Sequence, residues 1–372
     1  MKIGIITLAL HTNYGGLLQA YALQTALERM GHEVCHIQEK RNFRKKPLWK
    51  IPLVYVKRIL KKMSGQQCIV FQERKFNKER PVIGKYTDKF ITRHIKQLQV
   101  ENFSDISEKD FDAFVVGSDQ VWRPKYFYDK IECAYLDFTE GWNIKRIAYA
   151  ASFGTDKWEY SAKQTKRCGK LLNKFNAVSF REDAGVRLCH EKMGIESQHV
   201  IDPTMLLSAE DYIRLFKDSD VRKSNGNLLT YILDEDKKKD ILINNIAKEN
   251  GLVPFRVNSK RTNPSAPLTD RIQPPVEAWL RGFYDAKLVV TDSFHACVFS
   301  ILFGKPFIVF ANKERGMSRF TSLLQMFELE QCLITDVTDK IVFPKIDFNK
   351  VSNLLEKERS LAFKFLNKAL EA

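Results

Sequence analysis

The sequence lacks any run of about eighteen apolar residues, so it predicts no membrane-spanning helix. Its first stretch, MKIGIITLAL, has no small-residue cleavage site, and we interpret it as a buried strand and not as a signal peptide. The seven cysteines include no C-x-x-C pair, which indicates reduced thiols in a cytosolic protein. A G-x-S-x-G elbow, a Walker loop and a G-x-G-x-x-G fingerprint are also missing. We therefore expect neither a metal ion nor a bound cofactor.

Positive charge is in excess, because 60 Lys and Arg face 45 Asp and Glu and give a net charge of +15. Such a balance favours anionic partners. Residues 40–62 contain ten Lys or Arg and no acidic residue, and Val56, Ile59, Leu60 and Met63 recur there at helical spacing. This run is either a basic amphipathic segment that rests on anionic lipid headgroups or a solvated helix at a domain edge. We expect no nucleic-acid partner, because no zinc-finger spacing or other nucleic-acid motif is present.

Predicted strands alternate with predicted helices almost throughout, which is typical of a mostly parallel α/β architecture. The length of 372 residues suits two domains. We place an N-terminal domain at residues 1–204, with a basic insert at about 40–100, and a C-terminal domain at 205–350. The amphipathic helix expected at 351–372 is predicted to pack back across both domains.

In open α/β sheets, ligands bind beyond the carboxyl ends of the strands, and five loops carry suitable residues there. The first loop, His11–Ala20, is either an anion site at a helix N-terminus or a tight turn with a capping Asn. Its candidates are Asn13, Tyr14, Gly15, Gly16 and Gln19. In the second loop Asp119 is either a helix cap or a group that binds a sugar hydroxyl or moves a proton. Its neighbours Ser118, Gln120 and Trp122 are candidates for binding, the last as an apolar or stacking wall.

The other three loops carry cations and an imidazole. Arg181 follows a strand, where it either binds phosphate or carboxylate or pairs with an acidic neighbour on the surface. His295, preceded by Ser293, stands at the mouth of the strand KLVVT, and an imidazole there can take and give a proton. Arg315 and Arg319 lie where another strand passes into a helix, and form either an anion-binding patch or a solvated loop.

Six blocks of the sequence resemble those of one family and occur in its order: GIITLALHTNYGGLLQAYALQ, VVGSDQVWRP, RIAYAASFG, VSFRED, HVIDPTMLL and VVTDSFHACVFSILFGKPF. The set spans about residues 3–325 and resembles the polysaccharide pyruvyl transferase family. The resemblance implies two Rossmann-like domains that face a cleft, as in GT-B glycosyltransferases. It also implies transfer of a pyruvyl group from phosphoenolpyruvate to two hydroxyls of a sugar, which forms a cyclic ketal without a cofactor.

The resemblance also implies roles for individual residues. A histidine in the block matched by DSFHA is linked to donor binding and proton transfer, which assigns that role to His295. Arg181, in the block matched by SFRED, becomes a ligand of the donor's phosphate or carboxylate. Some members have arginine where this chain has Ser293. The candidates to replace that cation are Lys305, Arg315 and Arg319. One group must donate a proton and another accept one; we expect His295 and Asp119 in these roles, with their order left open.

Acceptors in such pathways are often sugars on a lipid diphosphate carrier, which gives the run at 40–62 a purpose at the inner face of the cell membrane. The enzyme is then cytoplasmic and peripheral. Two other functions fit parts of the pattern. A GT-B glycosyltransferase with a nucleotide-sugar donor shares the architecture. A non-catalytic module could bind anionic lipid or nucleic acid through the same basic run.

Overall fold

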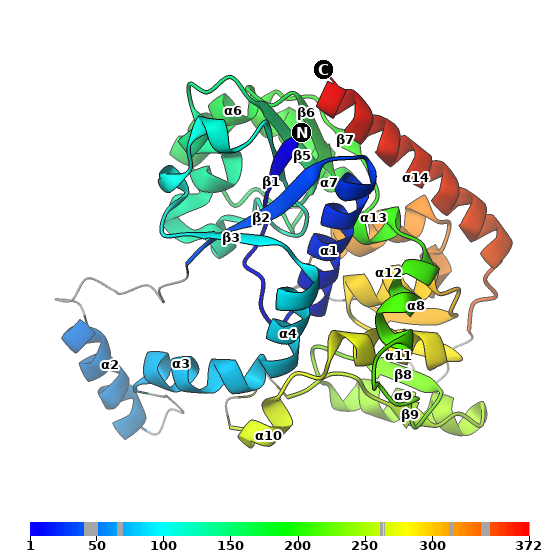
Figure 1. The fold of residues 1–372 in the computed structure, drawn as a ribbon. Coiled ribbons are helices and arrows are strands. Elements are labelled where there is room, and N and C mark those ends of the chain that lie inside the picture. The colour runs from blue at the N-terminus through cyan, green and yellow to red at the C-terminus, as the bar shows by residue number, and fades with distance from the viewer. Residues whose placement is uncertain are drawn as a thin grey trace.

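Two parallel β-sheets with helices packed against them make up the chain in a computed structural model (Figure 1). The structure describes residues 1–40, 51–64, 70–260, 263, 265–311, 316–335 and 343–371. Both sheets have the strand orders of doubly wound α/β folds, which confirms the predicted class of two Rossmann-like halves. None of the described helices is long and apolar enough to cross a membrane.

The first sheet has the strand order β3-β2-β1-β4-β5-β6-β7, and all of its neighbours are parallel. Its strands are β1 (Lys2–Ile6), β2 (Glu33–Glu39), β3 (Gln97–Val100), β4 (Ala113–Val116), β5 (Lys145–Ala151), β6 (Ala177–Phe180) and β7 (Gln198–His199). The winding reverses between β1 and β4, and such a reversal is where ligands bind in these sheets. Asp119 lies just past the end of β4.

The second sheet has the order β12-β11-β10-β8-β9 and is also parallel. Its strands are β8 (Leu228–Tyr231), β9 (Pro254–Phe255), β10 (Leu288–Thr291), β11 (Phe307–Phe310) and β12 (Leu333–Ile334). The winding of this sheet reverses between β8 and β10. His295 follows β10, so it also stands at a reversal point, the one that belongs to the second sheet.

Helices connect these strands in both halves. Those of the first half are α1 (Tyr14–Arg29), α2 (Ile51–Met63), α3 (Gln72–Ile83), α4 (Lys85–His94), α5 (Pro124–Phe127), α6 (Ala162–Leu172) and α7 (Asp183–Met193). Those of the second half are α8 (Ala209–Lys217), α9 (Lys237–Glu249), α10 (Leu268–Arg271), α11 (Val276–Asp285), α12 (Phe294–Leu302), α13 (Met317–Met326) and α14 (Phe348–Glu371). The helix α14 lies along both halves (Figure 1). Its Phe365 ring packs near Tyr149 in β5, Arg359 donates to Met205 O at 2.9 Å, and Lys350 forms an ion pair with Glu328, which follows α13.

Strand side chains alternate between the two faces of each sheet and so divide the apolar residues into separate cores. In β4, Val115 belongs to a core on one face, whereas Phe114 and Val116 belong to a core on the other. The core that contains Val115 continues into the second sheet, where it includes Val289 of β10. The two halves are therefore joined by one continuous apolar core.

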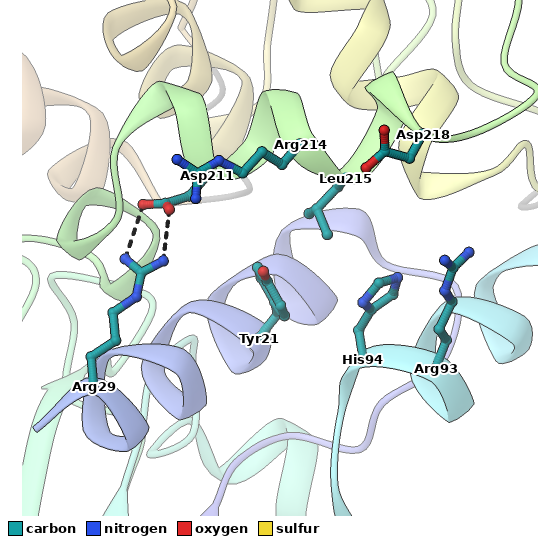
Figure 2. A pocket seen from close by; sticks show the side chains of 8 residues that line it. All are labelled: Tyr21, Arg29, Arg93, His94, Asp211, Arg214, Leu215 and Asp218. Carbon is teal, nitrogen blue, oxygen red and sulfur yellow. Dashed lines mark hydrogen bonds and ion pairs between the residues drawn. The ribbon is translucent and has the colours of Figure 1, made fainter. Parts of the chain in front are cut away.

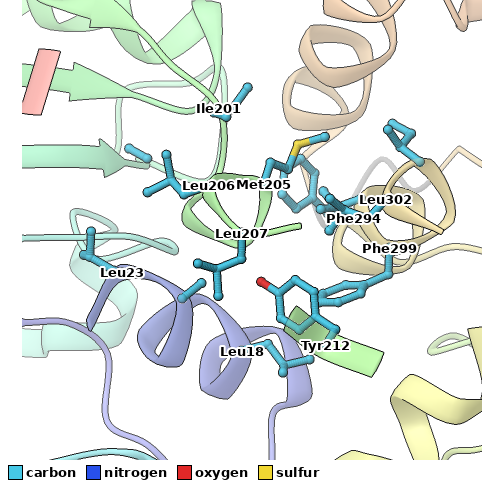
Figure 3. Packing of buried hydrophobic residues seen from close by; sticks show 14 of the residues in the cluster. Leu18, Leu23, Ile201, Met205, Leu206, Leu207, Tyr212, Phe294, Phe299 and Leu302 are labelled. Carbon is cyan, nitrogen blue, oxygen red and sulfur yellow. The ribbon is translucent and has the colours of Figure 1, made fainter. Parts of the chain in front are cut away.

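The chain crosses between the sheets through the 3₁₀ helix η6 (Pro203–Leu206), which contains the predicted division near residue 205. This crossing is not an exposed linker, since every residue of η6 is buried. Figure 3 shows Met205 and Leu206 between side chains of α1, such as Leu23, and side chains of α12, such as Phe299. The crossing segment is thus part of the shared core.

The predicted insert at 40–100 is only partly separate from the fold. Figure 1 shows α2 and α3 extending away from the sheets, whereas α4 packs beside α1. Phe90 and Ile91 of α4 belong to the shared core, and β3 forms the edge of the first sheet. The insert therefore ends near Gly84, at the start of α4. Residues 41–50 and 65–69 of the predicted insert lie outside the described residues.

Candidate active site

His295 lies in the first turn of α12 and meets the glycine loop of the other half. A Cβ atom on Gly15 would lie only 2.0 Å from Nδ1 of His295, so only glycine leaves room for the ring. The predicted loop at His11–Ala20 thus has a specific reason for Gly15, namely the close approach of an imidazole from the second half. The ring is 8% exposed.

Arg181 and two carboxylates make a buried ion-pair network beside this ring. Nη2 of Arg181 donates to Oδ1 of Asp119 at 2.8 Å, and Nη1 donates to Oδ2 of Asp202 at 2.7 Å. The Arg181 side chain is fully shielded from solvent, and its guanidinium carbon lies 4.7 Å from the centre of the Phe294 ring. Arg181 therefore organises two carboxylates, and each of its terminal nitrogens donates to one of them.

Asp202 joins this network to His295, because its Oδ2 lies 3.7 Å from Nε2 of the imidazole. Asp202 also accepts from the backbone and hydroxyl of Thr204, at 3.0 and 2.7 Å. Burial lowers the pKa of His295 below its ordinary value, although Asp202 acts to raise it. Burial alone would raise the pKa of Asp202, but His295 and Arg181 hold it below the usual range. The pair is thus a neutral imidazole beside an ionised carboxylate.

Asp119 is ionised for a similar reason. Burial acts to raise its pKa, but Arg181, His295 and Arg319 together lower it. Its backbone has φ 58°, a left-handed conformation that side-chain-bearing residues seldom adopt, and it leaves the strand directly at the reversal point. Two ionised carboxylates, from β4 and from η6, therefore flank one arginine.

Arg319 on α13 brings a second cation to the cluster. Its guanidinium carbon lies 5.8 Å from the centre of the Phe294 ring, which Arg181 also contacts. Burial, and then repulsion by Arg181, lower its pKa to about 10, which still leaves it charged at neutral pH. Glu182 is fully buried 3.9 Å from Nε of Arg181, and burial raises its pKa.

Three of the residues predicted to bind a ligand are buried and make their contacts within the protein. The expectation for Trp122 is wrong: it is fully buried, donates to Ala134 O at 2.8 Å and stacks on Tyr135 at 4.8 Å. Ser118 is also fully buried; its hydroxyl donates to Ala150 O, and its N–H donates to Gln19. Gln19 therefore ties the loops after β1 and β4 together and does not face a ligand.

Lys305 lies at the wrong edge of the sheet. It precedes β11, whereas His295 follows β10, and in a parallel sheet these two positions are at opposite ends. Its ammonium group donates to Tyr284 O at 2.7 Å. Lys305 therefore cannot replace a missing phosphate ligand. Arg315 lies outside the described residues.

The remaining candidates border the cluster. Tyr14 is buried, and its hydroxyl donates to Pro274 O at 2.8 Å, so it joins α1 to the second half. Asn13 occupies the N-cap of α1 without a side-chain cap, and the three atoms nearest to a Cβ placed on Gly16 belong to the Asn13 side chain. Ser293 stands at the N-cap of α12, and its N–H donates to Thr291 at 3.0 Å. Gln120 lies against Gly154 and accepts from Arg123.

Asp202 lies in the block HVIDPTMLL, but it is not among the candidate site residues predicted from the sequence. The available signal was an Asp directly before Pro at the end of β7, which is typical of a 3₁₀-helix cap. Asp202 does cap η6 through Thr204. Its second function depends on side chains from β6 and α12, which lie far away in the sequence.

One pattern in the sequence is typical of a metal site. His32 and His36 have the H-E-x-x-H spacing, but they lie before and within the strand β2 and not on a helix. Four residues of extended backbone separate their Cα atoms by about 13 Å. His36 is fully buried and its Nε2 lies 3.1 Å from Ala20 O. Within the described part of the chain, no three His, Cys, Asp or Glu side chains are grouped as a metal site would require.

A surface pocket of about 280 Å³ lies elsewhere, between α1, α4 and α8 (Figure 2). Arg29 of α1 and Asp211 of α8 form an ion pair at one end of it, with contacts of 2.6 and 3.0 Å. Arg93 and Arg214 also line this pocket. None of the cluster residues contributes to this pocket, so we interpret the ion pair as a second link between the halves.

Comparisons with known proteins bear on this site. No curated protein matches the chain. Similar solved structures include a glycosyltransferase from Rickettsia africae (12% identity, TM-score 0.46), which covers 100% of this chain and 96% of that chain. UDP-GlcNAc 2-epimerase from Neisseria meningitidis (10%, 0.47) and MurG from Acinetobacter baumannii (10%, 0.42) each cover 99% of this chain and 94% of their own. The family model of the polysaccharide pyruvyl transferases matches residues 13–314, a range that includes Asp119, Arg181 and His295. The chain therefore belongs to the polysaccharide pyruvyl transferase family and is an enzyme that transfers pyruvyl groups.

Proposed function

We propose that this pyruvyl transferase takes its pyruvyl group from phosphoenolpyruvate and joins it to two hydroxyls of one sugar as a cyclic ketal. The observation that supports the proposal is the contact of His295 with the Arg181–Asp202 ion pair, which brings groups of both sheets together. Phosphoenolpyruvate requires cations for its phosphate and carboxylate and a proton for its methylene carbon. The cluster offers both kinds of group.

Charge balance suggests how the donor and the proton arrive together. Asp119, Asp202 and Glu182 offset the charges of Arg181 and Arg319, so the described cluster carries no excess of positive charge while His295 is unprotonated. A multiply charged donor therefore favours the imidazolium form of His295, because a nearby anion raises the pKa of a histidine. Binding would load the proton that the reaction then consumes, and Arg319 would meet the phosphate or carboxylate.

The proposed reaction begins with protonation of phosphoenolpyruvate. His295 gives its proton to the methylene carbon, and the electron pair of the C=C bond forms the new C–H bond. One sugar hydroxyl bonds to the adjacent cationic carbon, and Asp119 takes the hydroxyl proton, which later restores His295. The C–O bond to phosphate then breaks. The second hydroxyl closes the ketal, and its proton leaves with inorganic phosphate.

For the acceptor, we propose a sugar of an exopolysaccharide precursor carried on a lipid diphosphate. Such a precursor is anionic and lies at the membrane surface, which suits a chain with a net charge of +15. The enzyme would then act from the cytoplasmic side, as a peripheral protein on the inner face of the cell membrane.

The donor can be tested without knowledge of the acceptor sugar. At one hundred times its Kd, a ligand stabilises the fold by about 2.7 kcal/mol, which for 372 residues corresponds to a rise in Tm of about 3 °C. We expect that rise with phosphoenolpyruvate, accompanied by proton uptake in calorimetry. A rise with UDP-sugars and none with phosphoenolpyruvate would instead support a glycosyltransferase.

The catalytic part needs its own variant. His295→Gln should lower ketal formation by about 10²-fold or more, measured as phosphate release and as the ketal methyl signal in NMR spectra of a glycan precursor fraction. Lys305→Ala, at the opposite edge of the sheet, is the matched control and should retain wild-type turnover. Near-normal ketal formation by folded His295→Gln would contradict the assignment.

A further inference from the structure

The described contacts that join α2 to the turn before α3 come from one side of the helix. The Tyr55 ring meets the Phe71 ring edge-on at 5.1 Å, and Arg58 donates to Val70 O at 3.1 Å. Tyr55 and Arg58 lie three positions apart, so they occupy the same side of the helix. This side faces the turn that leads into α3, and it fixes which side of α2 points outward.

The outward side of α2 is apolar. At about 3.6 residues per turn, positions 53, 56, 59, 60 and 63 fall on one arc, away from Tyr55 and Arg58. Their side chains are all exposed: Leu53 by 64%, Val56 by 53%, Ile59 by 42%, Leu60 by 60% and Met63 by 79%. Five large apolar side chains on one helix form an unusual patch for a surface, and among the described residues nothing covers it.

Lysines border this patch. Lys57 and Lys61 follow one edge of the arc, whereas Lys62 lies between Arg58 and Tyr55 on the other side of the helix. None of the three forms an ion pair within the described part of the chain. The helix has no acidic residue. Figure 1 shows α2 set apart from both sheets, so that the patch and its lysines are presented together. Lysines on the rim of an apolar arc can extend to anionic headgroups while the arc enters the acyl region.

We propose that α2 is an interfacial helix that docks this enzyme on an anionic lipid bilayer. Leu53, Val56, Leu60 and Met63 enter the headgroup boundary, and Lys57 and Lys61 bind lipid phosphates. Charge complementarity favours a bilayer over a second copy of the chain, because two copies would bring their lysines together. The inference rests on the proposed function for its purpose, since a lipid-linked acceptor lies at that surface. Membrane docking itself is independent of the donor chemistry.

The test uses the full-length chain and vesicles of phosphatidylglycerol or of phosphatidylcholine. We expect co-sedimentation with the anionic vesicles, weaker binding in high salt, and little binding to the neutral ones. Lys57→Gln/Lys61→Gln should weaken binding roughly thirtyfold. Val56→Gln/Leu60→Gln, which keeps good helix formers in α2, should weaken it by about tenfold or more.

Matched controls lie on the second half, where Ile241 is 57% and Val253 is 55% exposed. Ile241→Gln/Val253→Gln and Lys237→Gln/Lys248→Gln remove the same kinds of side chain and should bind vesicles like the wild type. Wild-type binding by both α2 variants, or no binding by the wild type, would overturn the proposal. A dimer that Val56→Gln/Leu60→Gln converts to a monomer, without vesicle binding, would overturn it in favour of a second copy.

The two proposals fail separately. If phosphoenolpyruvate neither stabilises the protein nor turns over, the proposed function fails while vesicle binding stands. If the α2 variants keep the wild-type response to phosphoenolpyruvate and also keep vesicle binding, only the docking inference fails.

Discussion

Asp202→Asn tests whether the contact between the two halves serves catalysis. The change keeps the shape of the side chain and an acceptor for Thr204, but it removes the charge that faces Arg181 and His295. Breaking a buried ion pair costs about 3–5 kcal/mol, and we expect the lower end because Arg181 keeps Asp119. Spread over the unfolding entropy of 372 residues, about 3 kcal/mol lowers Tm by about 4 °C.

The pH dependence of turnover separates a positioning role from mere stability. Asp202 raises the pKa of His295, so its neutralisation lowers that pKa further. The limb of the pH–rate profile that depends on the titration of His295 should therefore move to lower pH in Asp202→Asn. We expect kcat at the new optimum to fall by about 10²-fold, measured by phosphate release from phosphoenolpyruvate.

Asp211→Asn is the control for the loss of an ion pair between the halves. It removes the partner of Arg29 at the pocket of Figure 2, away from His295. It should lower Tm while kcat and the pH profile stay unchanged. The reasoning would be refuted by an Asp202→Asn enzyme that is destabilised like Asp211→Asn yet has the wild-type pH profile.

Two further predictions concern the glycine loop and the first sheet. Gly15→Ala should lower kcat by about 10²-fold, because the added methyl group would displace the His295 ring. Gly16→Ala should leave kcat unchanged, because the atom nearest to its added methyl group lies 3.5 Å away. Measuring kcat of both variants in parallel tests this prediction. Burial lowers the pKa of His36 to about 4, so the folded state rejects a proton that the unfolded state accepts below about pH 6.5. Stability should therefore fall as the pH drops from 6.5 toward 4, by about 2 kcal/mol at pH 5 from this group. Denaturant titrations at pH 7 and pH 5 measure the free energy of unfolding of the wild type and of His36→Gln. Between these pH values the variant should lose about 2 kcal/mol less than the wild type, and an equal loss in both proteins would contradict the prediction.

The strands of both sheets follow from local sequence, because parallel strands are buried on both faces and read as apolar runs. KIGII and LVVT are examples, and the structure has strands at both. The edge strand β3 was not predicted, because its sequence QLQV has no apolar run and its residues are partly exposed. What places it in the sheet is its ladder with β2, which is a long-range contact.

For the site, position at a strand end identified His295, Asp119 and Arg181 correctly as neighbours, since the rule depends on topology alone. The same rule failed for Trp122, because a side chain beside a strand end can turn inward as easily as outward. It could not identify Asp202, whose importance comes from partners on β6 and α12. Chemistry carried by single loops is thus readable from sequence, while chemistry shared between distant loops is not.

The apolar crossing at η6 limits how substrates can reach the cluster. If the two halves moved apart as rigid bodies, η6 would stay with one of them. Leu206 and its neighbours would then lose their contacts with either α1 or α12. At about 2 kcal/mol for each large side chain, exposing three would cost about 6 kcal/mol and leave about one molecule in 10⁴ open. Entry and exit of the donor through small displacements of individual loops would avoid this cost.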